Sequence, residues 1–115
     1  MRAGLTLEAL KEELRDRYLL TYKECKKFKY FPTAFLSMIT SGEDIVEVTR
    51  RLVHKKGGTE GFTTLFLNGH MELSVEKIIL EDHFRELFDR EDLLAAYNRL
   101  EEHEYPDIDQ IKKPR

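Results

Sequence analysis

Two acidic residues four positions apart, Glu72 and Glu76, are the clearest candidates for catalytic chemistry in this chain. On one helix this spacing would place both carboxylates on the same face, where they could bind a metal ion or exchange protons with a substrate. His70 is near enough in sequence to join them, so a small metal-assisted hydrolase is one hypothesis. The competing interpretation is structural, because acidic residues favour the start of a helix and Glu76 could pair with an arginine such as Arg99. We favour the structural interpretation.

Other catalytic and metal-binding patterns are missing from the sequence. His70 and His83 have no recognised metal-ligand spacing. Cys25, the only cysteine, falls on an apolar helical stripe and is expected to be a buried thiol. The serines lack a Gly-x-Ser-x-Gly context, and the glycines lack the Lys-Ser/Thr of a phosphate-binding loop. We therefore expect no catalytic residue, no metal and no cofactor.

The segment 22–31, Tyr-Lys-Glu-Cys-Lys-Lys-Phe-Lys-Tyr-Phe, interleaves lysines with aromatic residues. Lysines neutralise phosphates, and exposed aromatic rings stack on bases. A second basic group at 50–56 would extend this patch if the two helix ends met. The candidate nucleic-acid-binding residues are Lys23, Lys26, Lys27, Lys29, Tyr30, Arg50, Arg51, Lys55 and Lys56. Against this hypothesis, the core also needs aromatic residues, and lysines are common at helix C-termini.

Length and composition indicate one small domain in a reducing compartment. The chain has 115 residues, of which 41% are hydrophobic and 36% charged, with a net charge of −3. This charge is too small to indicate a partner. A single cysteine cannot form an intrachain disulfide. The first ten residues lack the unbroken apolar stretch of a secretory signal, and no apolar run is long enough for a membrane span. We expect a cytoplasmic protein without a membrane partner.

Apolar residues that recur every three or four positions predict helices along most of the chain. The first and longest is expected over 6–27, with Thr6 as its N-cap. Further helices are expected over 33–40, 43–55, 59–69, from Ser74 to about 80, and from Asp89 to about 103, with a connecting turn at 84–88. The segment 59–69 would also tolerate a strand, but no partner strand is visible elsewhere.

These elements predict an all-α fold. We expect a single compact domain over 1–104, built from five or six mostly short helices with a long N-terminal helix. Residues 105–115 contain two prolines and little apolar content, so they are predicted to form a flexible C-terminal tail.

Several blocks of sequence, in this order, resemble a family of small uncharacterised bacterial proteins. The blocks are Tyr-Phe-Pro-Thr-Ala-Phe-Leu-Ser-Met-Ile at 30–39, Gly-Phe-Thr-Thr-Leu at 61–65, Gly-His-Met-Glu-Leu-Ser-Val-Glu at 69–76, Phe-Arg-Glu-Leu-Phe at 84–88 and the helix 93–100. The family pattern includes Gly-Phe-x-x-Leu, Gly-Arg-Leu-Asp-Leu-Thr-Val-Glu and Phe-x-x-Leu-Phe, and the match covers about residues 28–102. The resemblance implies a protein of bacterial or phage origin linked to a restriction or other defence system, without implying a mechanism. His70-Met71 stands where the family has Arg-Leu, so no role of that arginine is carried over.

Three functional hypotheses follow from these observations. The first is a non-catalytic helical interaction or accessory module that binds another protein, acts as a monomer or homodimer and exposes an apolar patch. The second is an accessory protein that binds DNA or RNA through the basic residues of 23–29 and 50–56. The third is the hydrolase that would use Glu72, Glu76 and His70.

Overall fold

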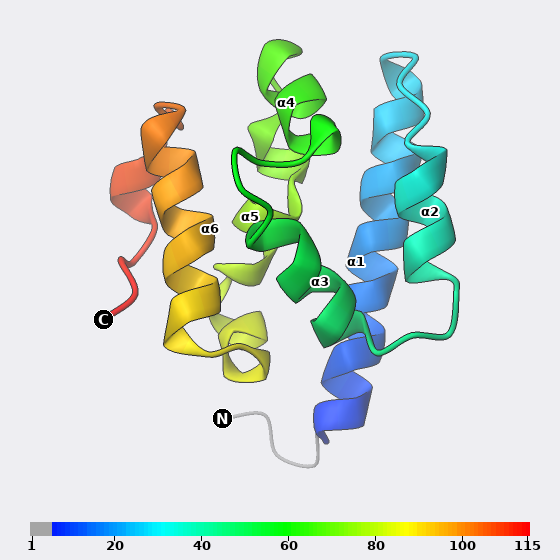
Figure 1. Ribbon diagram of the computed structural model, residues 1–115, viewed down its shortest axis with the longest axis horizontal. Coiled ribbons are helices and arrows are strands. Elements are labelled where there is room, and N and C mark those ends of the chain that lie inside the picture. The colour runs from blue at the N-terminus through cyan, green and yellow to red at the C-terminus, as the bar shows by residue number, and fades with distance from the viewer. Residues whose placement is uncertain (1–5) are drawn as a thin grey trace.

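A computed structural model describes residues 6–115, and all regular structure in that range is helical (Figure 1). It contains six α-helices and three short 3-10 helices. The α-helices are Leu7–Lys27 (α1), Thr33–Ile39 (α2), Ile45–Val53 (α3), Glu60–Leu67 (α4), Val75–Ile79 (α5) and Arg90–Glu102 (α6). The 3-10 helices are Met71–Leu73 (η1), Asp82–Leu87 (η2) and Ile108–Gln110 (η3). The predicted all-α class is confirmed, and the ambiguous segment 59–69 contains a helix.

Side-chain caps explain where several of these helices begin. The hydroxyl of Thr6 accepts a hydrogen bond from the backbone N–H of Ala9 at 3.0 Å. Thr59 and Ser74 cap α4 and α5 in the same way. Each cap satisfies a backbone N–H that the first helical turn leaves without a partner. The predicted N-caps at Thr6 and Ser74 are confirmed.

Some helix boundaries differ from the prediction by one or two residues. The helix expected over 43–55 begins only at Ile45, because the carboxylate of Asp44 accepts the N–H of Val46 at 2.8 Å and ends the preceding loop. After α3 the chain turns at Gly57 and Gly58, whose φ angles of 79° and 87° favour glycine. These local contacts shift the boundaries without changing the order of the elements.

The short helix α5 lies in the interior and joins the other elements. It packs against α3 and α6 and against the two flanking 3-10 helices η1 and η2. In the view of Figure 1 it lies between α6 and α1. Residues of the fully buried core come from nearly every element: Leu10, Leu14, Tyr18, Ile39, Ile45, Val48, Ile78, Ile79, Phe84, Ala96 and Leu100. The α1–α3 contact includes one buried polar pair, since the Tyr18 hydroxyl lies 2.6 Å from Thr49 Oγ1.

Residues 105–115, for which the sequence predicts a loose tail, lie against the helical domain in the structure. The Tyr105 side chain is buried in the core. Further along, Arg85 donates a 2.6 Å hydrogen bond to the carbonyl of Lys112, and the Lys113 ammonium lies 5.9 Å from the centre of the Tyr97 ring. Composition alone overlooks that one aromatic side chain can anchor an otherwise polar segment.

None of the helices formed by residues 6–115 combines the length and the apolar character needed to cross a bilayer.

Candidate functional site

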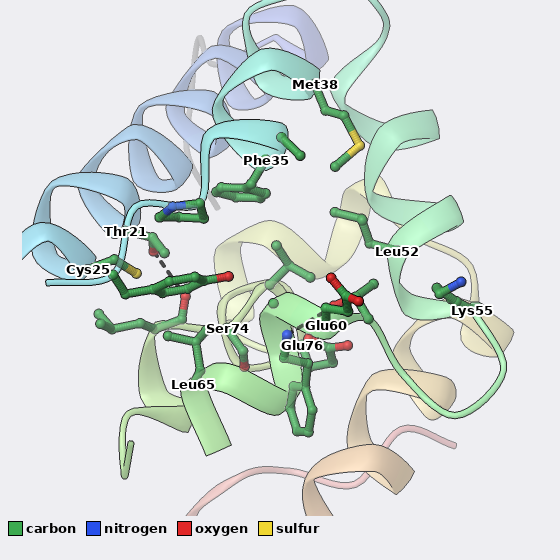
Figure 2. A pocket seen from close by; sticks show the side chains of 18 residues that line it. Thr21, Cys25, Phe35, Met38, Leu52, Lys55, Glu60, Leu65, Ser74 and Glu76 are labelled. Carbon is green, nitrogen blue, oxygen red and sulfur yellow. Dashed lines mark hydrogen bonds between the residues drawn. The ribbon is translucent and has the colours of Figure 1, made fainter. Parts of the chain in front are cut away.

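A pocket with a volume of about 460 Å³ lies where α1, α2, α3, α4 and α5 meet (Figure 2). This volume is within the range of natural ligand sites. Its walls are mostly apolar, and the large apolar side chains among them are Phe35, Met38, Leu52, Phe62, Leu65, Leu73 and Val75. Five α-helices and η1 therefore converge on one concave, mostly apolar site.

The exposure of the lining residues distinguishes the mouth of the pocket from its floor. Ala34, Lys55 and Glu60 line the pocket and are exposed, so they mark the mouth. Cys25 and Glu76 line it and are buried, with exposed fractions of 1% each, so they mark the floor. Figure 2 shows Glu76 across the pocket from Phe35 and Met38.

Glu76 is held at the floor by an ion pair with Arg99. Arg99 Nη1 donates to Glu76 Oε2 at 3.0 Å and to the carbonyl of Val53 at 3.1 Å. Its Nη2 donates to the carbonyl of Lys55 at 2.8 Å. One guanidinium from α6 thus fixes both the buried carboxylate of α5 and the C-terminal end of α3. The contact between Glu76 and Arg99 that the sequence suggested is present.

Burial controls the ionisation of the groups at the floor. Burial raises the pKa of the Glu76 carboxyl above its ordinary value, while the contact with Arg99 acts in the opposite direction. Burial likewise raises the pKa of the Cys25 thiol to about 11. A neutral thiol is a weak nucleophile, and none of the described residues that line the pocket is a histidine.

The three residues of the hydrolase hypothesis do not share this site. His70 Nδ1 lies 3.1 Å from Glu72 Oε2, and the Glu72 side chain is half exposed. Glu72 belongs to η1, whereas Glu76 belongs to α5 and lines the pocket. Within residues 6–115 there is no group of three or more His, Cys, Asp or Glu side chains that could hold a metal ion. Only Glu76 of the three is in the pocket.

The two arginines of the basic hypothesis are already paired with carboxylates. Arg51 makes a two-pronged contact with Glu43, at 2.9 and 3.1 Å. Arg50 contacts Glu47 at 2.7 Å and Asp92 at 3.1 Å. Intramolecular acids therefore neutralise the arginine part of the predicted patch.

The aromatic residues of the segment 22–31 mostly pack within the molecule. The ring of Phe28 stacks on His70 with a centroid distance of 4.3 Å. Tyr30 lines the pocket, and burial raises the pKa of its hydroxyl. Phe31 is the exception, since 55% of its surface is exposed. Little of the aromatic content of this segment is thus available for stacking on bases.

The predicted lysines differ in the contacts that they make. Lys27 pairs with Glu24 at 2.8 Å, and the Lys26 ammonium lies 5.4 Å from the centre of the Tyr22 ring. Lys23, Lys29 and Lys56 make no ion pair with another residue of the described chain. Lys55 lies at the mouth, on the α3 side of the pocket, opposite the Cys25 end of α1 (Figure 2). Of the predicted lysines, Lys55 is the one that lines the pocket.

Sequence reasoning missed the role of Asp92. Its side chain is 6% exposed and contacts three groups: Arg50 Nε at 3.1 Å, His54 Nε2 at 2.7 Å and the backbone N–H of Asp89 at 3.1 Å. Burial alone would raise the pKa of this carboxyl, but the contacts with His54, Asp89 and Arg50 hold it below its ordinary value. Asp89 and Asp92 form a capping box at the start of α6, and the spacing of these two acids is a sequence signal for that contact. The contacts of Asp92 with Arg50 and His54 of the α3 region have no such signal in the sequence.

Comparisons with known protein families, curated proteins and solved structures identify no relative of this chain. No protein-family model matches the chain, and neither does any curated protein or solved structure. The family resemblance over residues 28–102 stays a prediction from the sequence.

Proposed function

We propose that this chain is a non-catalytic interaction module that binds a partner protein by accepting an apolar side chain of the partner in the pocket between α1 and α5. The observation that carries the proposal is the pocket itself, whose volume of about 460 Å³ is lined mainly by apolar side chains. A close-packed small domain rarely leaves such a space unfilled. The link to a bacterial or phage defence system, implied by the family resemblance, belongs to this proposal.

An exposed aromatic residue next to the pocket in the chain supports the hypothesis of a protein partner. Phe31 lies between two residues that line the pocket, Tyr30 and Pro32, and 55% of its own side chain faces solvent. Exposed aromatic side chains beside a concave apolar site are typical of protein interfaces. A partner that fills the pocket could cover Phe31 at the same time.

Binding of DNA or RNA has less support. The arginines at 50 and 51 are neutralised by acids of the same chain, and Tyr30 faces the pocket. Because nucleic-acid affinity depends on cations that can pair with phosphates, we expect these residues to contribute little to such binding. The remaining lysines leave this alternative open to a direct test.

The experiment compares two variants of α2 in affinity capture from extracts of the bacterial host, with and without phage infection and with and without nuclease treatment. Ala34→Leu places a larger side chain at the mouth of the pocket. Ser37→Leu adds the same side chain to an exposed position of α2 that does not line the pocket. We expect one protein to be retained by the parent chain and by Ser37→Leu, and to be lost with Ala34→Leu. After purification, that protein should bind the Ala34→Leu chain at least about tenfold more weakly, as expected for the loss of an interface hot spot.

Two results would overturn the proposal. One is equal retention of the partner by both variants, which would place the interface elsewhere. The other is capture that disappears on nuclease treatment, with a steep dependence of binding on salt, which would favour the nucleic-acid alternative.

A further inference from the structure

The fold does not use all of the hydrogen-bonding capacity of the carboxylate at the pocket floor. Glu76 is 1% exposed. Its ion pair with Arg99 at 3.0 Å favours the ionised form and opposes the effect of burial, which raises the pKa of this carboxyl. An ionised carboxylate can accept about four hydrogen bonds. Arg99 Nη1 supplies one donor, and the backbone N–H of Glu76 itself supplies another. No other donor among residues 6–115 bonds to this carboxylate. Glu76 also lines the pocket, so an occupant that reaches the floor would meet a carboxylate whose acceptor capacity is only partly used.

The walls around this carboxylate suit an aromatic group. Met38 and Cys25 place sulfur atoms on the pocket surface, and Phe35 and Phe62 contribute rings. Sulfur contacts aromatic rings favourably, and aromatic rings prefer offset or edge-to-face contact with one another. A planar aromatic occupant would gain more from these walls than a small aliphatic side chain.

The charges around the pocket favour an occupant without net charge. Lys55 and Glu60, of opposite sign, are both at the mouth (Figure 2). At the floor, Glu76 is paired with Arg99. A charged group would therefore lose its hydration on entry without meeting an unpaired opposite charge at the floor, and such a loss is costly. A neutral donor avoids that cost.

We infer that the pocket recognises a neutral aromatic group that carries one polar hydrogen, the side chain of a tryptophan or tyrosine of the partner, and that Glu76 accepts the hydrogen bond from its N–H or O–H. This inference rests on the proposed function and specifies the chemistry of the partner's anchor. Tryptophan and tyrosine are also the residues that most often dominate protein interfaces.

The test compares two small probes of nearly the same shape, indole and benzofuran. Benzofuran has an oxygen in place of the indole N–H, so it can fill the same space but cannot donate. Binding is followed by NMR through the methionine methyl signals, because Met38 lines the pocket and Met71 does not. Indole should shift the Met38 signal and leave Met71 nearly unchanged. It should bind about tenfold or more tightly than benzofuran, since a hydrogen bond to a charged acceptor is among the stronger ones.

Two variants separate the donor contact from simple filling of the pocket. Ala34→Leu should weaken both probes alike. Glu76→Gln keeps an acceptor but removes its charge, and charged acceptors bond about twice as strongly as neutral ones. The preference for indole should then fall from about tenfold to about threefold. If this variant fails to fold, as judged from the Met71 signal, the comparison of the two probes on the parent chain still decides the question.

Each outcome bears on the inference separately from the proposed function. Equal affinity for indole and benzofuran overturns the role of Glu76 as the acceptor, even if both probes shift Met38. Failure of both probes to shift Met38 overturns the inference of an aromatic anchor. In either case, loss of the partner with Ala34→Leu would leave the proposed function standing. Equal capture of the partner by Ala34→Leu and Ser37→Leu would overturn both the inference and the proposed function.

Discussion

Arg99 donates a hydrogen bond to Glu76 over 3.0 Å and thereby joins α6 to the floor of the pocket on α5. The same guanidinium bonds to two backbone carbonyls at the end of α3, those of Val53 and Lys55. Since α3 supplies one wall of the pocket and α5 its floor, this single side chain fixes the relative position of both.

Replacing Arg99 by methionine should destabilise the fold strongly. The substitution keeps much of the apolar stem but leaves a buried carboxylate without its cation, which typically costs about 3–5 kcal/mol. Urea denaturation followed by circular dichroism would measure the loss in the free energy of unfolding. Arg90→Met is the matched control, because Arg90 is exposed at the start of the same helix. A change of less than about 1 kcal/mol for Arg99→Met would contradict this account of the ion pair.

Adding a second substitution should recover part of that loss. In Glu76→Gln with Arg99→Met the charge that was left unpaired is gone, so the double variant should be more stable than Arg99→Met alone. The same denaturation experiment gives the coupling energy between the two positions. Additive effects of the two substitutions would show that the ion pair does not couple them.

The contacts of Asp92 predict a loss of stability in acid. Although burial opposes it, the hydrogen bonds from His54, Asp89 and Arg50 hold the pKa of Asp92 below its ordinary value of about 3.9. A carboxyl group whose pKa is lower in the folded than in the unfolded chain stabilises the fold at any pH above its unfolded pKa. This stability is lost as the pH falls through the folded-state pKa. Asp92→Asn should therefore cost about 1–3 kcal/mol at pH 7, and the gap between parent and variant should narrow below about pH 4.

Unfolding by urea at several pH values would measure this gap. Asp109→Asn serves as a control, because Asp109 is exposed in the C-terminal segment. The assignment of Asp92 would be wrong if the difference between parent and Asp92→Asn were the same at pH 3 and pH 7.

Two glycines offer a test of packing against Arg99. Gly58 and Gly42 both have φ near 90°, which strains any other residue. An added Cβ at Gly58 would lie 3.4 Å from Arg99 Nε, whereas one at Gly42 would meet nothing within 4 Å. Both alanine variants should lose about 1 kcal/mol or somewhat more from the backbone, and the two losses should be similar, because 3.4 Å is an ordinary van der Waals contact. Thermal melting would compare them, and a clearly larger loss for Gly58→Ala would show that the Arg99 side chain cannot accommodate the added methyl group.

The thiol of Cys25 should react slowly with thiol reagents. Burial raises its pKa to about 11, so near pH 8 it should contain about a hundredfold less thiolate than an ordinary thiol. The rate of modification by a chromogenic disulfide would be compared with that of Ser37→Cys in a Cys25→Ala background, where the new thiol is exposed. Similar rates for the two thiols would show that the floor of the pocket opens readily.

Local sequence signals predicted most of the elements, because they act within a few residues. Thr6, Ser74 and Asp89 each begin a helix through a contact with the residue three positions further on. Such contacts can be predicted from the residue types at these positions in the sequence. Asp92 and His54 are 38 residues apart, so only tertiary packing brings them together.

The pocket could not be predicted from the sequence for a related reason. Phe35, Met38 and Leu52 have the apolar spacing of core residues. Whether such side chains fill a space or surround one depends on how five helices meet, and hydrophobic periodicity does not encode that. Glu76 was recognised as a residue that could pair with Arg99, but its place at the floor of a pocket became visible only in three dimensions.

The methyl signal of Met38, followed while the purified partner is added to this chain, tests whether the partner enters the pocket. The Met38 signal should shift on binding, and the signal of Met71, buried outside the pocket, should stay nearly constant. Saturable binding of the partner with an unchanged Met38 signal would contradict the claim that the partner enters the pocket.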